Sequence, residues 1–84
     1  MEDYNAYILQ SKSHSRFYTG ISSQADQRLF YHNAGLNTST KNGRPWQRLW
    51  LSESMDKTAA LILERKIKKR GAKRFLIDKN VFLD

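Results

Sequence analysis

The fold is decided by residues 5–32, NAYILQSKSHSRFYTGISSQADQRLFYH, in which two strand-like segments precede a helix. Tyr4–Leu9 and Arg16–Ile21 are rich in aromatic and branched residues, which favour strands. The polar stretch Gln10–Ser15 between them is typical of a turn. We therefore expect an antiparallel hairpin that leads directly into a helix.

The helix after the hairpin is expected to begin at Ser22 or Ser23 and to end at Gly35. Asp26 follows Ser23 by three residues, in the manner of a capping box. Glycine is the residue that most often follows a helix C-terminus. These local signals predict a helix of about ten residues on the C-terminal side of the second strand.

Side chains from the hairpin and the helix are expected to converge on one small area. Arg28 and His32 are four residues apart, so they share a face of the helix. A hairpin that feeds straight into the helix brings Tyr7 and Tyr18 into the same neighbourhood. Gly20 is suited to start the bend into the helix, and its missing side chain also allows another group to come close.

Each of these side chains also has an ordinary structural explanation. Tyr7 and Tyr18 are suited to cross-strand aromatic packing, which sheets use routinely. Arg28 is suited to a solvated helix surface, and His32 to an interaction with the helix dipole. Composition and spacing alone leave both interpretations open.

The order of these residues resembles the GIY-YIG nuclease family. Tyr7 matches the tyrosine that ends the first signature of that family, and Tyr18–Gly20 matches the second signature. Arg28 falls at the spacing of the family's helix arginine, and His32 at its next helix position, often His or Tyr. Glu64, set in an apolar helix, matches the metal-ligand glutamate.

The segment Thr40–Trp46, TKNGRPW, is similar to one found in small stand-alone bacterial members related to the nuclease domain of UvrC. The resemblance extends from Tyr4 to about Ile77. It departs from the family pattern at Ile21, where many members have lysine or another polar residue, and at Leu76, where many have asparagine.

The resemblance implies a metal-dependent DNA endonuclease that acts in repair or recombination. Tyr7 is then the general base toward a water molecule, with His32 as an assisting or alternative base. Tyr18 orients the water or the phosphate, and Arg28 holds the non-bridging phosphate oxygens. Glu64 is the ligand of one Mg²⁺ ion, for which Mn²⁺ is an alternative.

The rest of the chain is expected to complete a small sheet and its helices. Trp46–Ser52 is the third strand, with both of its tryptophans in the core or covering the sheet. The main helix is expected to begin at the N-cap Asp56 and to stop at Gly71. A short final helix around Phe75–Ile77 is expected to pack on the sheet, and Val81–Leu83 to dock or fray.

Glu64 lies in the apolar stripe of the main helix. The stripe recurs at helical spacing through Ala60, Leu63 and Ile67. A carboxylate at a semi-buried position is costly unless it is paired or bound to a metal. The alternatives are an ion pair with Lys68 or Arg28 and an Mg²⁺ site, because Mg²⁺ often takes only one or two protein carboxylates.

The formal net charge of +7 and the pI near 10 predict a polyanionic partner. The cations near the end of the main helix are expected to contact phosphates: Lys68, Lys69, Arg70, Lys73 and Arg74. The polar segment 36–45 is expected to contain a short helical turn, and it adds Lys41 and Arg44 as candidate phosphate contacts. An ordinary loop without a role in binding is the alternative.

Length and composition set the outer limits. The 84 residues predict a single domain, 1–84, with a modest core. The sequence has no cysteine, no apolar run of about 20 residues and no signal peptide after its acidic start, so a cytoplasmic protein without a membrane span is expected.

Together these features predict an α/β fold of the α+β type, a three-stranded, mostly antiparallel sheet flanked by helices in the order β-β-α-β-α. The expected partner is DNA, with RNA left open, and the expected state is a monomer or weak dimer. Specificity comes from nucleic-acid structure, comes from a protein partner, or is absent. The alternative function is a catalytically inactive nucleic-acid-binding module with the same fold, and a third is a basic protein-interaction domain.

Overall fold

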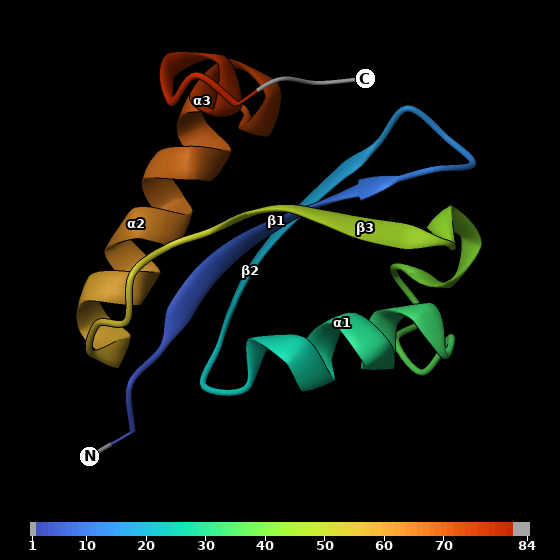
Figure 1. Ribbon diagram of the computed structural model, residues 1–84, viewed down its shortest axis with the longest axis horizontal. Helices are drawn as coiled ribbons and strands as arrows, with labels where there is room; N and C mark the ends of the chain where they lie inside the picture. The colour runs from blue at the N-terminus through green and yellow to red at the C-terminus, as the bar shows by residue number, and fades with distance from the viewer. Residues whose placement is uncertain (1, 82–84) are drawn as a thin grey trace.

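The computed structural model describes residues 2–81 and contains a three-stranded sheet with helices on both faces (Figure 1). Its strands are β1 (Asn5–Ser11), β2 (Phe17–Ser22) and β3 (Trp46–Leu51). The strand order is β2-β1-β3, and β1 is antiparallel to both neighbours. The α+β class and the antiparallel sheet predicted from the sequence are therefore confirmed.

The helices are α1 (Ala25–Asn33), α2 (Lys57–Arg70) and α3 (Ala72–Asp78), with a 3-10 turn η1 (Lys41–Gly43) before β3. α2 and α3 lie on one side of the sheet, and α1 lies on the other (Figure 1). The short helical turn in segment 36–45 and the final helix were both predicted. Within the described residues, no helix has the length and apolar character needed to span a bilayer.

Alternation along β1 divides the core in two. Ala6 and Ile8 pack with Ile67 of α2 and Leu76 of α3, and all four side chains are fully buried. Tyr7 and Leu9 point to the opposite face, where they pack with Trp46 and with Leu29 of α1. The central strand is thus buried on both faces, and its α1 face contains the polar groups described below.

Local signals set the ends of α2. The Asp56 side chain accepts a hydrogen bond from the Ala59 backbone N–H at 2.7 Å, which confirms the predicted N-cap. Gly71 ends the helix with a φ of 92°, in the left-handed region that favours glycine. Leu63 packs against the core beside Ile67, so the predicted apolar stripe is confirmed.

The predicted start of α1 is wrong. The N-cap is Gln24, which makes no side-chain capping bond. Ser22 remains in β2, paired with Asn5, and its Oγ accepts the backbone N–H of Gln24 at 2.9 Å. Asp26 does not form the expected capping box with Ser23, since its carboxylate pairs with Arg48 of β3 at 2.8 Å.

The other differences are shifts of strand ends. β1 starts one residue later than predicted and continues to Ser11, while β2 starts at Phe17. β3 ends at Leu51, and Ser52 instead ties the strand end to β1 through its Oγ, which accepts the Ala6 N–H at 2.8 Å. Val81 packs against the core. Phe82 and Leu83 lie outside the described residues.

Candidate active site

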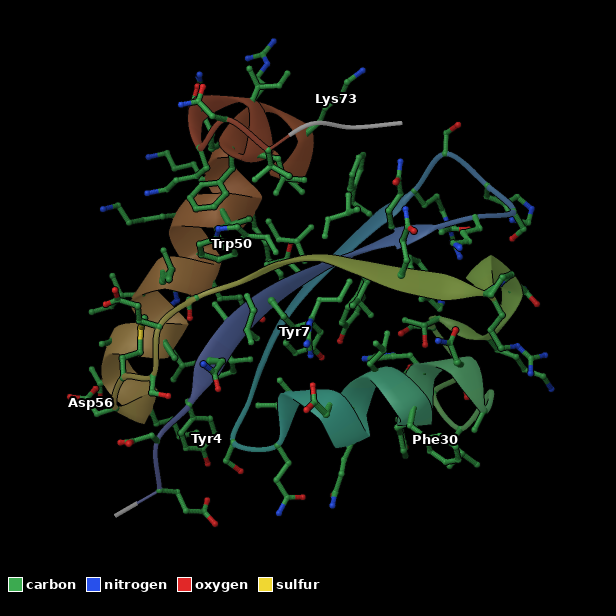
Figure 2. All side chains as sticks on the ribbon, in the orientation of Figure 1. Tyr4, Tyr7, Phe30, Trp50, Asp56 and Lys73 are labelled. Atoms are coloured by element: carbon green, nitrogen blue, oxygen red, sulfur yellow. The ribbon has the colours of Figure 1, made fainter. Side chains whose placement is uncertain are left out.

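A cluster of polar and aromatic side chains lies between the sheet and α1, with Tyr7 at its centre (Figure 2). The Tyr7 side chain is 1% exposed, and its hydroxyl lies 3.1 Å from Nε2 of His32. The Tyr18 ring, from β2, lies 4.7 Å from the His32 ring and 6.3 Å from the Tyr7 ring, centroid to centroid. The two strands and the helix therefore bring these three side chains together, as predicted.

Gly20 makes room for the Tyr7 phenol. The two residues are directly opposite each other in the β1–β2 ladder. A Cβ on Gly20 would lie 2.7 Å from the Tyr7 hydroxyl and 3.1 Å from Cε2 of Tyr18, closer than ordinary contact. The glycine of the second signature is thus explained by a close approach of side chains within the cluster, rather than by a turn.

His32 is held at both ring nitrogens. Its side chain is fully buried, and Nδ1 lies 2.9 Å from the Thr40 hydroxyl. Burial, together with the nearby positive charge of Arg28, lowers the pKa of His32. The imidazole is therefore neutral at neutral pH, so it can accept a proton there.

Thr40 belongs to the site, although no role was predicted for its side chain. It is 1% exposed and belongs to the predicted segment Thr40–Trp46. Its carbonyl accepts the Trp46 indole N–H at 2.7 Å, while Ser11 of β1 donates to the Gly43 carbonyl at 2.6 Å. These bonds fix the segment against the sheet and hold the Thr40 hydroxyl at the imidazole.

Arg28 lies at the edge of the cluster. Its guanidinium carbon is 4.7 Å from the centroid of the Tyr31 ring, a cation–π contact along the helix. Burial, followed by the proximity of Tyr18, raises the pKa of Tyr7, and Arg28 lowers it by a smaller amount. The protein alone thus favours a neutral Tyr7 phenol with a cation beside it.

Glu64 lies on α2, the helix that packs against β1 and β2 on the other face of the sheet. Its side chain is 19% exposed and pairs with Lys68 at 3.3 Å, so the predicted intrahelical ion pair is present. The alternative pair with Arg28 does not form among the described residues. The charge of Glu64 reaches Tyr7, since it contributes to the raised pKa of the phenol.

The metal-binding potential of the site rests on Glu64 alone. The part of the chain that the structure describes contains no group of three or more His, Cys, Asp or Glu side chains that could hold a metal ion. A single half-buried carboxylate does fit Mg²⁺, which completes its shell with water and phosphate oxygens. The donor set is therefore compatible with Mg²⁺ held jointly by the protein and a nucleic acid.

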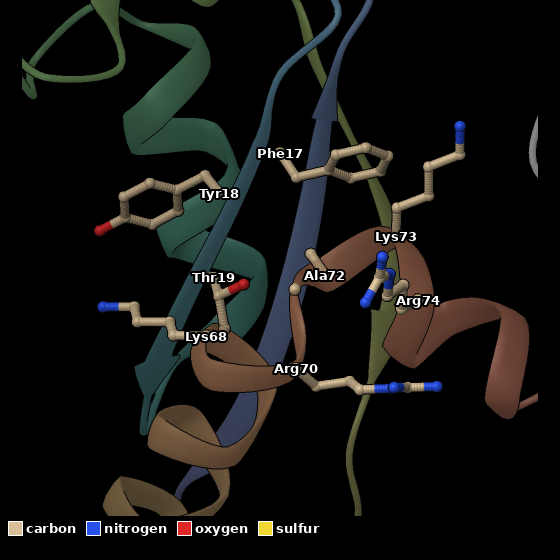
Figure 3. A pocket seen from close by; sticks show the side chains of 9 residues that line it. Phe17, Tyr18, Thr19, Lys68, Arg70, Ala72, Lys73 and Arg74 are labelled. Carbon is tan, nitrogen blue, oxygen red and sulfur yellow. The ribbon is translucent and has the colours of Figure 1, made fainter.

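A groove of about 600 Å³ lies along the outer edge of the sheet, between β2 and the junction of α2 with α3 (Figure 3). Phe17, Tyr18 and Thr19 form its sheet side. Four of the cations predicted to contact phosphate line its other side: Lys68, Arg70, Lys73 and Arg74. Lys69, predicted with them, is exposed on α2 but does not line this groove.

Tyr18 connects the groove to the cluster. Figure 3 shows Phe17 on the side of β2 that faces Lys73, whereas the Tyr18 ring extends from the other side of the strand. Lys68 and Arg70 are engaged with Glu64 and Asp78, so Lys73 and Arg74 are the lining cations without an ion pair among the described residues. Tyr18 thus belongs both to the lining of the groove and to the cluster on the α1 face of the sheet.

Lys41 and Arg44 occupy a different place. They line a second pocket together with Asn33, Asn42 and Pro45. The Arg44 Nε donates to the Lys41 carbonyl at 2.8 Å, and its guanidinium packs on Gly35. The structure brings these two predicted phosphate contacts to each other, away from the first groove.

The arrangement defines a small α+β domain whose buried phenol and imidazole lie beside a cationic groove at the sheet edge. The family model of the GIY-YIG catalytic domain matches residues 3–77. The chain therefore belongs to the GIY-YIG family, whose members are nucleases. Comparison with curated proteins and with solved structures gives no match. The closer likeness to UvrC stays a prediction.

Proposed function

We propose that this protein is a metal-dependent endonuclease that hydrolyses DNA phosphodiester bonds in repair or recombination. The observation that carries the proposal is the hydrogen bond between the Tyr7 hydroxyl and Nε2 of His32, inside a cluster that also holds Tyr18 and Arg28. A buried phenol bound to a neutral imidazole can remove a proton from water, which is the first requirement for hydrolysis.

Tyr7 and His32 act together in this proposal. Tyr7 takes a proton from the attacking water while its own proton passes to Nε2 of His32. Burial raises the pKa of the Tyr7 phenol, so very little free phenolate is present at neutral pH to act as a base. The coupled transfer avoids a free phenolate, because the imidazole receives the phenolic proton as the water proton arrives.

The remaining side chains act on the phosphate. The Tyr18 hydroxyl orients the phosphate or the water at the groove end of the cluster, and the Arg28 guanidinium binds the non-bridging oxygens through two donors. Glu64 would hold the Mg²⁺, giving up or sharing its bond to Lys68. When bound, the metal neutralises charge on the phosphate and on the leaving 3′ oxygen.

The groove is the proposed path of the nucleic acid toward the cluster. Lys73→Ala combined with Arg74→Ala should weaken DNA binding and reduce its salt dependence, because each lost phosphate contact lowers the salt slope by about one. The matched control is Arg65→Ala combined with Lys66→Ala, which removes two exposed cations of α2 outside the groove. Equal losses in the two double variants would contradict a defined path.

An inactive binding module is the second candidate function. The ion pair between Glu64 and Lys68 favours it, because this pair satisfies the carboxylate without a metal. Leu76 favours it as well, since it is fully buried in the apolar core at a position where many family members have asparagine.

Cleavage of labelled DNA separates the two candidates. Supercoiled, branched and single-stranded DNA, with an RNA of the same sequence, would be incubated at low salt with Mg²⁺, Mn²⁺ or EDTA. The endonuclease should give metal-dependent products that disappear with Glu64→Gln, a change that keeps the size of the side chain. The catalytic proposal would be overturned for these substrates if the wild type and Glu64→Gln both gave only the same metal-independent background of cleavage. Salt-sensitive DNA binding by both proteins would then favour the binding module.

A further inference from the structure

The contacts around His32 define a chain of hydrogen bonds that extends beyond the imidazole. The Tyr7 hydroxyl meets Nε2 at 3.1 Å, and the Thr40 hydroxyl meets Nδ1 at 2.9 Å. Thr40 Oγ1 also lies 3.4 Å from the backbone carbonyl of Asn37. Tyr7, His32 and Thr40 are all at most 1% exposed, so the chain is enclosed by the protein.

The direction of the chain follows from which atoms can donate. A neutral imidazole has one donor and one acceptor nitrogen, and a backbone carbonyl can only accept. Among the described residues, Nε2 is the one acceptor within hydrogen-bond distance of the Tyr7 hydroxyl. Arg28, the cation beside that oxygen, can only donate, so the phenolic hydrogen has no acceptor other than Nε2.

This assignment satisfies every group in turn. If Tyr7 donates to Nε2, the ring proton is on Nδ1 and is donated to Thr40 Oγ1. The Thr40 hydroxyl is then free to donate to the Asn37 carbonyl. In the reverse assignment Nε2 would donate to Tyr7, and the phenolic hydrogen would be directed at the Arg28 guanidinium, which cannot accept it. The first assignment agrees with the finding that no buried side-chain oxygen or nitrogen of the described residues lacks a partner.

We infer that Thr40 is a positioning residue that holds His32 in the Nδ1–H tautomer, so that Nε2 stays open to receive the Tyr7 proton. The inference rests on the proposed function for its catalytic meaning, although the tautomer can be measured without any cleavage. The proton balance is complete. As the water O–H bond breaks, an O–H bond forms at Tyr7, the original phenolic proton moves to Nε2, and His32 becomes an imidazolium whose Nδ1–H stays bonded to Thr40.

Hydrogen bonds that involve Trp46 explain why a residue eight positions after His32 can take this role. The Trp46 indole N–H binds the Thr40 carbonyl at 2.7 Å, and Asn33 exchanges two hydrogen bonds with the Trp46 backbone. The end of α1 and the segment that carries Thr40 are therefore tied to the same residue of β3. These hydrogen bonds between side chains and the main chain hold the Thr40 hydroxyl in place beside the His32 imidazole.

The test compares Thr40→Val, which keeps the shape but removes the hydroxyl, with Thr40→Ser, which keeps the hydroxyl. Imidazole ¹⁵N NMR should show a protonated Nδ1 and an unprotonated Nε2 in the wild type and in Thr40→Ser, and a population shifted toward protonated Nε2 in Thr40→Val. Thr38→Val, an exposed residue of the same segment, is the control. Amide spectra would establish that each variant is folded.

Thr40→Val should lower the single-turnover cleavage rate by about 100-fold, which is the lower end of what a positioned acid–base group contributes. Thr40→Ser should retain most of the wild-type rate. A protonated Nε2 in the wild type would overturn the inference whatever the cleavage result. An unchanged tautomer in Thr40→Val would overturn it too. A protein that shows the expected tautomers but cleaves no substrate would support the inference about Thr40 and refute the nuclease.

Discussion

Replacing Gly20 with alanine tests the geometry of the cluster without removing any functional group. The new Cβ would lie 2.7 Å from the Tyr7 hydroxyl, 2.9 Å from its Cζ and 3.1 Å from Cε2 of Tyr18, while ordinary contact begins at 3.4 Å. The phenol must therefore retreat by about 0.7 Å, which strains or breaks its 3.1 Å bond to His32.

This displacement should affect both the stability of the protein and its cleavage rate. Overpacking a buried position costs about 1–3 kcal/mol of unfolding free energy, and Gly20 is buried in the centre of β2. A misplacement of about 1 Å at a reacting group can cost on the order of 100-fold in rate. Gly20→Ala should therefore remain folded but cleave DNA about 100-fold more slowly.

The assay pairs urea unfolding with single-turnover cleavage, both well below the unfolding midpoint. Ile67→Val is the stability control, because Ile67 lies in the core on the opposite face of the sheet and the change costs about 0.5–1.5 kcal/mol. The control should keep the wild-type cleavage rate. A Gly20→Ala protein that cleaves as fast as the wild type would refute the assignment of Tyr7 and Tyr18 to the reacting centre.

Other changes test separate parts of the structure. Asp56→Ala should lower the unfolding free energy by about 1 kcal/mol in urea titrations, since it removes the capping bond of α2, and an unchanged midpoint would exclude that bond. Folding lowers the pKa of His32 from 6.5, so as the pH falls the unfolded chain takes up the imidazole proton before the folded protein does. The free energy of unfolding should therefore decrease as the pH drops below about 6.5, and level off below the pKa of His32 in the folded protein. This loss of unfolding free energy at low pH should be smaller in His32→Gln than in His14→Gln. Equal losses in the two variants would show that burial of His32 does not cause the pH dependence. Arg28→Lys keeps the charge but loses the two-pronged donor, so cleavage should drop at least about 10-fold with the fold intact, whereas full activity would exclude bidentate phosphate binding.

The residues that were correctly predicted obey local rules. Asp56 and Gly71 act through groups within one helical turn, so their roles follow from the adjacent sequence. Arg28 and His32 share a helix face because of helical periodicity, and the hairpin order places Tyr7 near them. These relations require no knowledge of the tertiary structure.

The predictions that were wrong, and the contact that was not predicted, involve side chains that bind residues distant in the sequence. Ser22 was expected to cap α1, but pairing with Asn5 extends β2 and takes it into the sheet. Asp26 was expected in the capping box, but Arg48 of β3 binds its carboxylate. Thr40 meets His32 only because the segment before β3 folds over the end of α1, which no periodicity in the sequence indicates.

The cations near the end of α2 were predicted to contact phosphate, but the groove itself was not predicted. Four of these cations line the groove, and their contact with phosphate stays a prediction. Its sheet side could not be predicted, because Phe17 and Tyr18 reach it through packing of α2 against the edge strand. Lys41 joined the prediction by composition alone and lies in another pocket.

The most direct test of the central claim is a paired measurement of binding and cleavage by the wild type and Tyr7→Phe, on the DNA that the wild type cuts best in Mg²⁺. Removing one buried oxygen should leave DNA affinity at its wild-type value and reduce single-turnover cleavage by at least about 100-fold, because the water loses its proton acceptor. Equal cleavage by the two proteins would contradict the account and would place the chemistry away from the Tyr7–His32 cluster.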